Sequence, residues 1–210
     1  MRHSLVHISS TLLCSFLLAG SALAQSQVAT NPGLAPPGRY SVVRDHTQVV
    51  FSIVHLGLSP YFGRVAGATG TMTFNPLDPS RSNLSIELDP KTVSTLSDLV
   101  SRQLCGDDVF ACAKFPKIAF KSTSIKRTGD STGDIAGDLT LAGVTKPVTL
   151  HAMFHGGMQG PLGQDNYQLG FSAETTLKRS DFNLTKMIWA STVSDEVKLT
   201  IAAEFEQDRR

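Results

Sequence analysis

The sequence lacks the features on which several protein classes depend. It carries 19 Lys plus Arg against 18 Asp plus Glu, a formal net charge of +1, and no run of like charge. Such a balance supplies no basic field for a polyanion, which disfavours nucleic-acid binding. The one long apolar run, Leu12 to Ala24, is shorter than the roughly 20 residues of a membrane-spanning helix. The sequence therefore does not predict an integral membrane protein.

The motifs of common enzyme classes are also missing. The sequence has no nucleophile elbow, H-E-x-x-H motif, phosphate loop, dinucleotide fingerprint or C-x-x-C pair. His151 and His155 would form a metal-binding pair on a helix, but on a strand they lie about 13 Å apart. Asp45 and His46 fall between two strands, where a turn role is expected. We predict no metal, no cofactor and no catalytic residue.

The N-terminal residues have the order of a secretory signal. Arg2 supplies a positive start, TLLCSFLLAG an apolar core, and Ala22-Leu23-Ala24 the small-x-small pattern of a cleavage site. Leu13 stands where a lipid-anchored Cys14 would need a small residue, which disfavours a lipoprotein. We predict a signal peptide over residues 1–24, cleavage after Ala24 and a periplasmic location.

Residues 25–38 are rich in Pro and Gly and have almost no apolar periodicity, which predicts a flexible linker. Two cysteines follow in the exported part, Cys105 and Cys112. An exported protein favours a disulfide between them, yet a continuous helix would hold their Cα atoms about 10 Å apart. The bridge therefore requires the chain to bend between them, and Gly106 offers a place where a helix can end.

From Arg39 onward, apolar residues recur at every second position, as they do in strands with one buried face. The final segment is the clearest case, with Val197, Leu199 and Ile201 alternating with Lys198 and Thr200. Gly, Pro, Asn or Asp stands at nearly every junction. The strands are predicted at 39–44, 47–57, 64–75, 82–93, 116–127, 133–142, 146–156, 166–178 and 194–207.

One segment follows helical spacing instead. Its apolar stripe comprises Leu96, Leu99, Val100, Gln103 and Leu104, and Thr95 with Asp98 offers a start similar to a capping box. One amphipathic helix beside many antiparallel strands predicts an all-β fold, and closure into a barrel of about eight strands would remove exposed edges.

Small residues recur on the predicted buried face. They either fill the taper of a packed core or leave volume for a chain-like ligand, and periodicity does not separate the two. The set comprises Ala66, Ala68, Gly70, Gly137, Ala152, Ala173 and Ala203.

Arg179 to Phe182 is typical of a tight turn, in which we expect Asp181 to accept backbone N–H bonds and Phe182 to plug one end of the barrel. Trp189, the only Trp, lies in the last connection, where it could line the mouth of a pocket. His55 shares a face with Phe51 and Ile53 and is expected at a strand end.

Five ordered segments together resemble the YceI family of periplasmic lipid-binding proteins. KFPKIAFKS and GDLTLAGVTKPVTL are the most specific of them, and the departure from the family pattern lies in QLCGDDVFAC. The matching segments are FSIVHLGLSPYFGRVAG at 51–67, KFPKIAFKS at 114–122, GDLTLAGVTKPVTL at 137–150, RSDFNL at 179–184 and SDEVKLTI at 194–201.

The resemblance implies a lipocalin-like antiparallel barrel of eight strands over residues 39–207, with one helix at its side. It also implies an apolar tunnel for an isoprenoid or another long-chain amphiphilic lipid, and no catalytic residues. Buried-face positions supply the predicted ligand-binding residues, with His55 and Trp189 added near the ends: Phe51, Ile53, His55, Met72, Phe74, Ile118, Phe120, Leu139, Leu150, Phe154, Leu169, Phe171, Trp189 and Leu199.

Two other function classes stay open. An isomerase or hydrolase using the same tunnel would need a polar group deep inside it, for which His55 is the candidate. An interaction module, partnering a membrane cytochrome or a lipid-pathway protein, would show a large exposed apolar patch and no continuous cavity. The oligomeric state is also left open.

Overall fold

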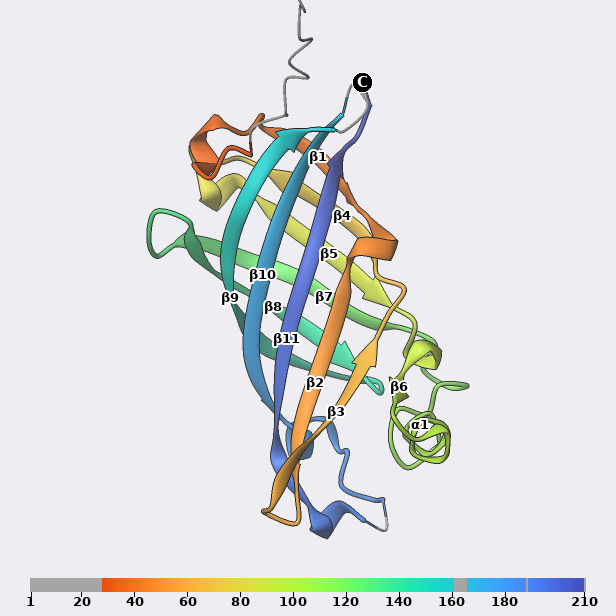
Figure 1. Ribbon diagram of the computed structural model, residues 1–210. Helices are drawn as coiled ribbons and strands as arrows, with labels where there is room; N and C mark the ends of the chain where they lie inside the picture. Colours follow the sequence, from red (N-terminus) through yellow and green to blue (C-terminus); the bar gives the residue numbers. More distant parts are fainter. Residues whose placement is uncertain (1–27, 161–165, 188, 210) are drawn as a thin grey trace, which may run out of the picture.

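The structure is a computed structural model that describes residues 28–160, 166–187 and 189–209 (Figure 1). The predicted signal peptide, its cleavage after Ala24 and the first residues of the predicted linker lie outside these ranges. No helix in the described ranges is long and apolar enough to cross a membrane.

The strands form a closed antiparallel barrel with a single α-helix in the described residues, as predicted. Eight strands close the ring in the order β1-β4-β5-β7-β8-β9-β10-β11, because β1 also pairs with β11. The strands are β1 (Gly38–Val42), β2 (Gln48–His55), β3 (Ser59–Val65), β4 (Thr69–Phe74), β5 (Asn83–Leu88), β6 (Ser94–Thr95), β7 (Ile118–Arg127), β8 (Thr132–Leu141), β9 (Val144–Gln159), β10 (Tyr167–Lys178) and β11 (Val193–Gln207), and the helix is α1 (Asp98–Leu104). Short 3-10 helices are η1 (Pro32–Leu34), η2 (Arg44–His46), η3 (Pro79–Arg81), η4 (Pro90–Thr92), η6 (Arg179–Phe182) and η7 (Ala190–Thr192).

At three positions around the barrel, two separate strands lie end to end: β1 and β2, β4 and β3, and β5 and β6. Along one edge of β11, residues 205–207 pair with β1 and residues 193–202 pair with β2. In the same way β4 continues from β3, and β6 follows β5 through η4. The extension β2-β3-β6 lengthens one side of the barrel, and α1 lies beside β6 (Figure 1).

The prediction of one strand over 64–75 is therefore wrong. The chain forms β3 and β4, which are separated at 66–68, where Gly67 has a positive φ of 73°. The predicted strand 47–57 ends earlier, at His55, because Leu56 and Gly57 both have positive φ and make a tight hairpin turn. Residues 59–63, with Pro60 and Gly63, belong to β3 rather than to a turn.

The described part of the predicted linker packs against the barrel. Ala29 forms an antiparallel bridge with Gly157 of β9, and Ala35 is 3% exposed. The Tyr40 hydroxyl donates to the Pro36 carbonyl at 2.7 Å. These contacts hold residues 28–38 on one end of the barrel, which composition alone did not predict.

The helix begins later than predicted. Ser97, not Thr95, is the N-cap, and its Oγ accepts the Val100 N–H at 3.4 Å. Thr95 belongs to β6, and Leu96 is fully exposed ahead of the helix. The apolar stripe that faces the protein therefore starts at Val100 and continues with Leu104.

Buried apolar residues form two clusters. The first surrounds the end of the barrel where β1 and the C-terminus lie, at the top of Figure 1, and we call it the aromatic end: Ala35, Tyr40, Met72, Leu84, Phe120, Leu150, Phe154, Leu169, Ala173 and Phe205. The second lies toward the β2–β3 hairpin and residues 179–192, and we call it the loop end: Val65, Val93, Leu104, Val109, Ile118, Leu141, Phe182, Leu184 and Met187.

Candidate ligand-binding cavity

The barrel encloses a cavity of about 530 Å³ that reaches from one buried cluster to the other. This volume is within the usual range of small-molecule sites. Its wall is almost entirely apolar and includes inward-facing residues of β2, β5, β7, β8, β9, β10 and β11. The interior is thus not a fully packed core.

Aromatic rings close the cavity at the aromatic end. Phe171 and Phe205 line the cavity, with ring centroids 5.9 Å apart. Behind them Phe154 lies 5.2 Å from Phe171, and Phe74 lies 6.3 Å from Phe154. Tyr40 has no exposed surface, and burial, with a smaller effect from Tyr167, raises the pKa of its phenol.

The predicted ligand-binding residues fall into two groups: those that line the cavity and those that pack at the aromatic end. Phe74, Phe154 and Leu169 are not in the cavity lining: Phe154 and Leu169 belong to the aromatic-end cluster and Phe74 packs against it, so their contact with a ligand stays a prediction. The lining contains Phe51, Ile53, His55, Met72, Ile118, Phe120, Leu139, Leu150, Phe171, Trp189 and Leu199. Their contact with a ligand stays a prediction.

The small residues of the predicted buried face have two different roles: some permit close contacts between strands, and others line the cavity. A Cβ on Gly137 would lie 2.5 Å from both the Lys121 carbonyl oxygen and the Phe120 ring, so Gly137 permits a close approach rather than providing free volume. Gly70 likewise lies against the backbone of Ser85. The small residues that do line the cavity are Ala68, Ala152, Ala173 and Ala203.

Several residues at the loop end and near it were not predicted from the sequence. Leu184 and Met187 line the cavity from the segment between β10 and β11, which has no strand periodicity. Phe182, which was expected to plug one end of the barrel, is 2% exposed and belongs to the loop-end cluster. Gly63 was missed as well: the Phe51 ring lies directly over its Cα, where a Cβ would approach within 2.2 Å. Glycine at this position therefore leaves room for the tip of the Phe51 ring.

Arg179 ties the loop end together. Its Nε donates to the Ser194 carbonyl at 2.9 Å and its Nη1 to the Leu184 carbonyl at 2.7 Å. Its Nη2 donates to the carbonyls of Ala190 and Val193 at 3.1 and 3.2 Å. A guanidinium suits this role because its donors form a rigid planar fork. One side chain thus connects η6, η7 and the start of β11.

The acceptor in this turn is Asp195 rather than Asp181, contrary to the sequence-based expectation. The Asp195 carboxylate accepts the Ser180 N–H at 2.9 Å and the Ser180 hydroxyl at 2.6 Å. These hydrogen bonds, with a smaller effect from the Arg179 charge, lower the pKa of Asp195.

The histidines lie apart from one another. His55 lines the cavity but is exposed at the end of β2. His46 bonds to Glu204, His151 to Asp134 and His155 to Ser172, all within 2.8 Å. No cluster of potential metal ligands occurs in the described ranges.

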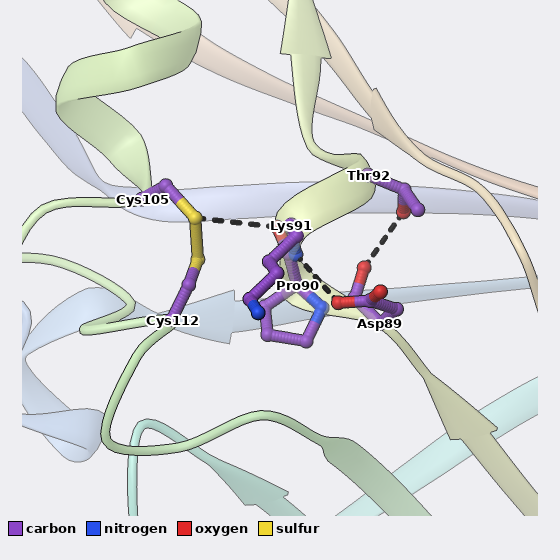
Figure 2. Close-up of a disulfide and its surroundings, with 6 residues drawn as sticks. All are labelled: Asp89, Pro90, Lys91, Thr92, Cys105 and Cys112. Carbon is purple, nitrogen blue, oxygen red and sulfur yellow. Dashed lines mark hydrogen bonds between the residues drawn. A yellow bond between two sulfur atoms is a disulfide. The ribbon is translucent and has the colours of Figure 1, made fainter.

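The α1 segment and the loop after it form a side wall of the cavity. The lining there comprises Val100, Gln103, Leu104, Val109 and Phe110. The helix ends at Leu104, and the chain turns back so that the Cα atoms of the Cys105–Cys112 disulfide lie 5.2 Å apart. Figure 2 shows the disulfide beside η4, which connects β5 to β6.

Comparisons with known proteins agree with this architecture. The sequence pattern of the family described as YceI-like domain matches residues 40–205. A UPF0312 protein of Ectopseudomonas mendocina is 34% identical over 194 residues, which cover 92% of this chain and 95% of that protein. Protein YceI of Salmonella arizonae is 36% identical over 192 residues, covering 91% of this chain and 98% of that protein.

Solved structures share the fold. The YceI protein of Campylobacter jejuni is 27% identical, with a TM-score of 0.65 over 74% of this chain and 90% of that chain. BcnA of Burkholderia cenocepacia is 21% identical, with a TM-score of 0.68 over 78% and 98%. A domain from Saccharophagus degradans, described as polyisoprenoid binding, is 15% identical, with a TM-score of 0.59 over 80% and 98%. The last two likenesses concern the fold alone.

Proposed function

The chain belongs to the YceI-like family, and from its apolar cavity we propose that it binds an isoprenoid-type or other long-chain amphiphilic lipid as a periplasmic carrier. The observation that carries the proposal is the continuous apolar cavity inside the closed barrel. The description of the related Saccharophagus degradans domain as polyisoprenoid binding supports it.

Burial of the chain supplies the binding free energy. Transfer of apolar surface from water is worth about 25 cal/mol per Å², or about 0.8 kcal/mol per buried methylene. A branched, semi-rigid isoprenoid also loses less conformational entropy on binding than a flexible chain of the same size. Affinity should therefore rise with chain length until the chain reaches the aromatic end.

The position of His55 argues against an enzyme that uses the same cavity. Its side chain is exposed at the end of β2, not deep within the barrel. Two polar side chains of the lining already have partners: Thr47 accepts the Glu204 N–H, and Ser172 bonds to His155. Apolar side chains are exposed on the β2–β3 hairpin, at Val54, Leu56, Leu58 and Phe62, but an outer-face module partnering a membrane cytochrome does not account for the continuous apolar cavity.

Native mass spectrometry of gently purified full-length protein tests the proposal. Expressed with its N-terminal segment, the protein should appear in the periplasmic fraction, begin at Gln25 and carry a noncovalent adduct with the mass of a long-chain lipid. Delipidated protein should take up the same class of lipid from a total lipid extract. A barrel that stays empty in both experiments would contradict the lipid-binding proposal, and cytoplasmic retention would contradict the carrier location alone.

A further inference from the structure

The ionisable side chains of the cavity lining gather at one end and lack carboxylates. His55, Lys178 and Arg179 lie at the loop end, whereas no Asp or Glu occurs among the described lining residues. At the opposite end the described lining has no Lys, Arg or His and consists mainly of aromatic and aliphatic side chains. The cavity thus has a basic end and an apolar end.

Arg179 contributes a buried positive charge to the basic end. It is 8% exposed, and no carboxylate in the described residues forms a salt bridge with it. The Arg179 charge helps to lower the pKa of Asp195, but the Asp195 carboxylate accepts two hydrogen bonds from Ser180 and does not line the cavity. Buried charges are normally paired, because desolvating a lone ion is costly. The four carbonyls that solvate the guanidinium reduce this cost but do not neutralise the charge.

The same end has hydrogen-bond donors to spare. A guanidinium has five N–H groups, and the four bonds to carbonyls leave one N–H of Nη1. Trp189 is half-buried in the lining, and its indole N–H bonds to no described residue. His55 likewise has no side-chain hydrogen bond to a described residue. Lys178 extends its exposed side chain beside this site and adds a further positive charge.

We propose that the loop end binds an anionic head group, an oxyanion such as a phosphate ester or carboxylate, through Arg179, Trp189 and His55. The apolar chain of the ligand then runs toward Phe171 and Phe205. This inference rests on the proposed lipid-binding function and adds the ligand's polarity and its direction in the barrel. Charge-assisted hydrogen bonds of this kind are stronger than those to a neutral hydroxyl.

The test compares two probes with the same chain, geranylgeraniol and geranylgeranyl monophosphate, each below its critical micelle concentration. We expect the wild-type protein to bind the monophosphate about tenfold more tightly, the equivalent of one charge-assisted hydrogen bond. Equal affinity, or tighter binding of the alcohol, would overturn the head-group site while leaving lipid binding intact. Binding of neither probe would instead contradict the proposed function.

Variants locate the effect at the loop end. His55→Leu and Trp189→Phe are chosen because neither residue holds the loop as Arg179 does, and each should lower the ratio of monophosphate to alcohol affinity. Lys126→Ala removes one positive charge from an exposed position of β7 outside the lining, so it should leave that ratio unchanged. If Lys126→Ala lowers the ratio as much as the other two, the preference is a general charge effect and the site assignment is wrong.

Discussion

The two ends of the barrel are closed by different means. At the aromatic end, rings from β4, β9, β10 and β11 pack on one another. At the loop end, the wall includes residues from α1, from the disulfide loop and from 179–187 and 189–193, which a buried arginine and a disulfide hold in place. Dense packing thus terminates the cavity at one end, whereas hydrogen bonds and a covalent bridge frame the other.

This difference matters because the two kinds of closure respond differently to change. Packed rings lose dispersion contacts on every side when one of them is truncated. A loop held by hydrogen bonds and one disulfide can move locally while the strands stay paired. We therefore associate stability with the aromatic end and ligand entry with the loop end.

The largest stability effect is expected at the aromatic end. Phe154→Ala removes a ring that is 6% exposed and packs against both Phe74 and Phe171. The cavity it leaves should lower the free energy of unfolding by about 3–5 kcal/mol, as measured by urea denaturation.

Phe51→Ala is the matched variant in the cavity wall. Phe51 is half-buried and faces the cavity on one side, so its ring makes fewer protein contacts that truncation can remove. It should destabilise the protein clearly less than Phe154→Ala does. If both variants lose the same free energy of unfolding, the two positions are packed alike and the proposed difference between the two ends is wrong.

The variant without the disulfide should show the next largest loss of unfolding free energy. Replacing both Cys105 and Cys112 by Ser should cost about 2–3 kcal/mol, because a short loop is no longer closed in the unfolded state. Val109 and Phe110 in this loop line the cavity, so release of a bound fluorescent lipid should also become faster. Thiol titration of unfolded, unreduced wild type should find no free thiol at this pair. An unchanged release rate in the variant would show that the loop is not part of the entry route.

A smaller effect is expected for Tyr40→Phe, which removes the hydrogen bond to the Pro36 carbonyl at a cost of about 1 kcal/mol. Burial raises the pKa of Tyr40 in the folded state, so above about pH 10 the unfolded state loses its proton first. Wild-type stability should thus be complete below that pH and fall as pH rises above it. Tyr40→Phe should flatten this alkaline decline, although Tyr167, whose pKa burial also raises, will keep part of it. Identical alkaline slopes would contradict the account.

The alternation of apolar residues predicted the barrel because period two is a local property of each strand. It placed Leu150, Phe120 and Leu199 on the inner face, where they line the cavity. The alternation did not predict the position of each residue along the barrel axis. Phe154 and Leu169 share the inward face but lie beyond the end of the cavity, a position set by strand register and tilt.

The loop end was less predictable for a related reason. Leu184, Met187 and Arg179 act there through contacts with residues on other elements, and their segment has no repeating pattern. The start of β3 was equally hidden, because Gly63 is a typical turn residue although in the structure it lies within β3 and leaves room for the Phe51 ring of the neighbouring strand. Such pairings become visible only when the strands are brought together.

If a lipid chain occupies the cavity up to the aromatic end, Ala152→Phe should shorten the longest chain that the protein binds. Ala152 lines the cavity next to Phe171 and Ala173, so a ring there would extend the aromatic layer and shorten the space for a chain. Met153→Phe, at a neighbouring exposed position, is the matched control. Binding of prenyl alcohols of increasing length to delipidated protein, followed by native mass spectrometry, should show a shorter maximum chain for Ala152→Phe and the wild-type length for Met153→Phe. If folded Ala152→Phe accepts the same longest chain as wild type, or if wild type accepts no chain, the account is contradicted.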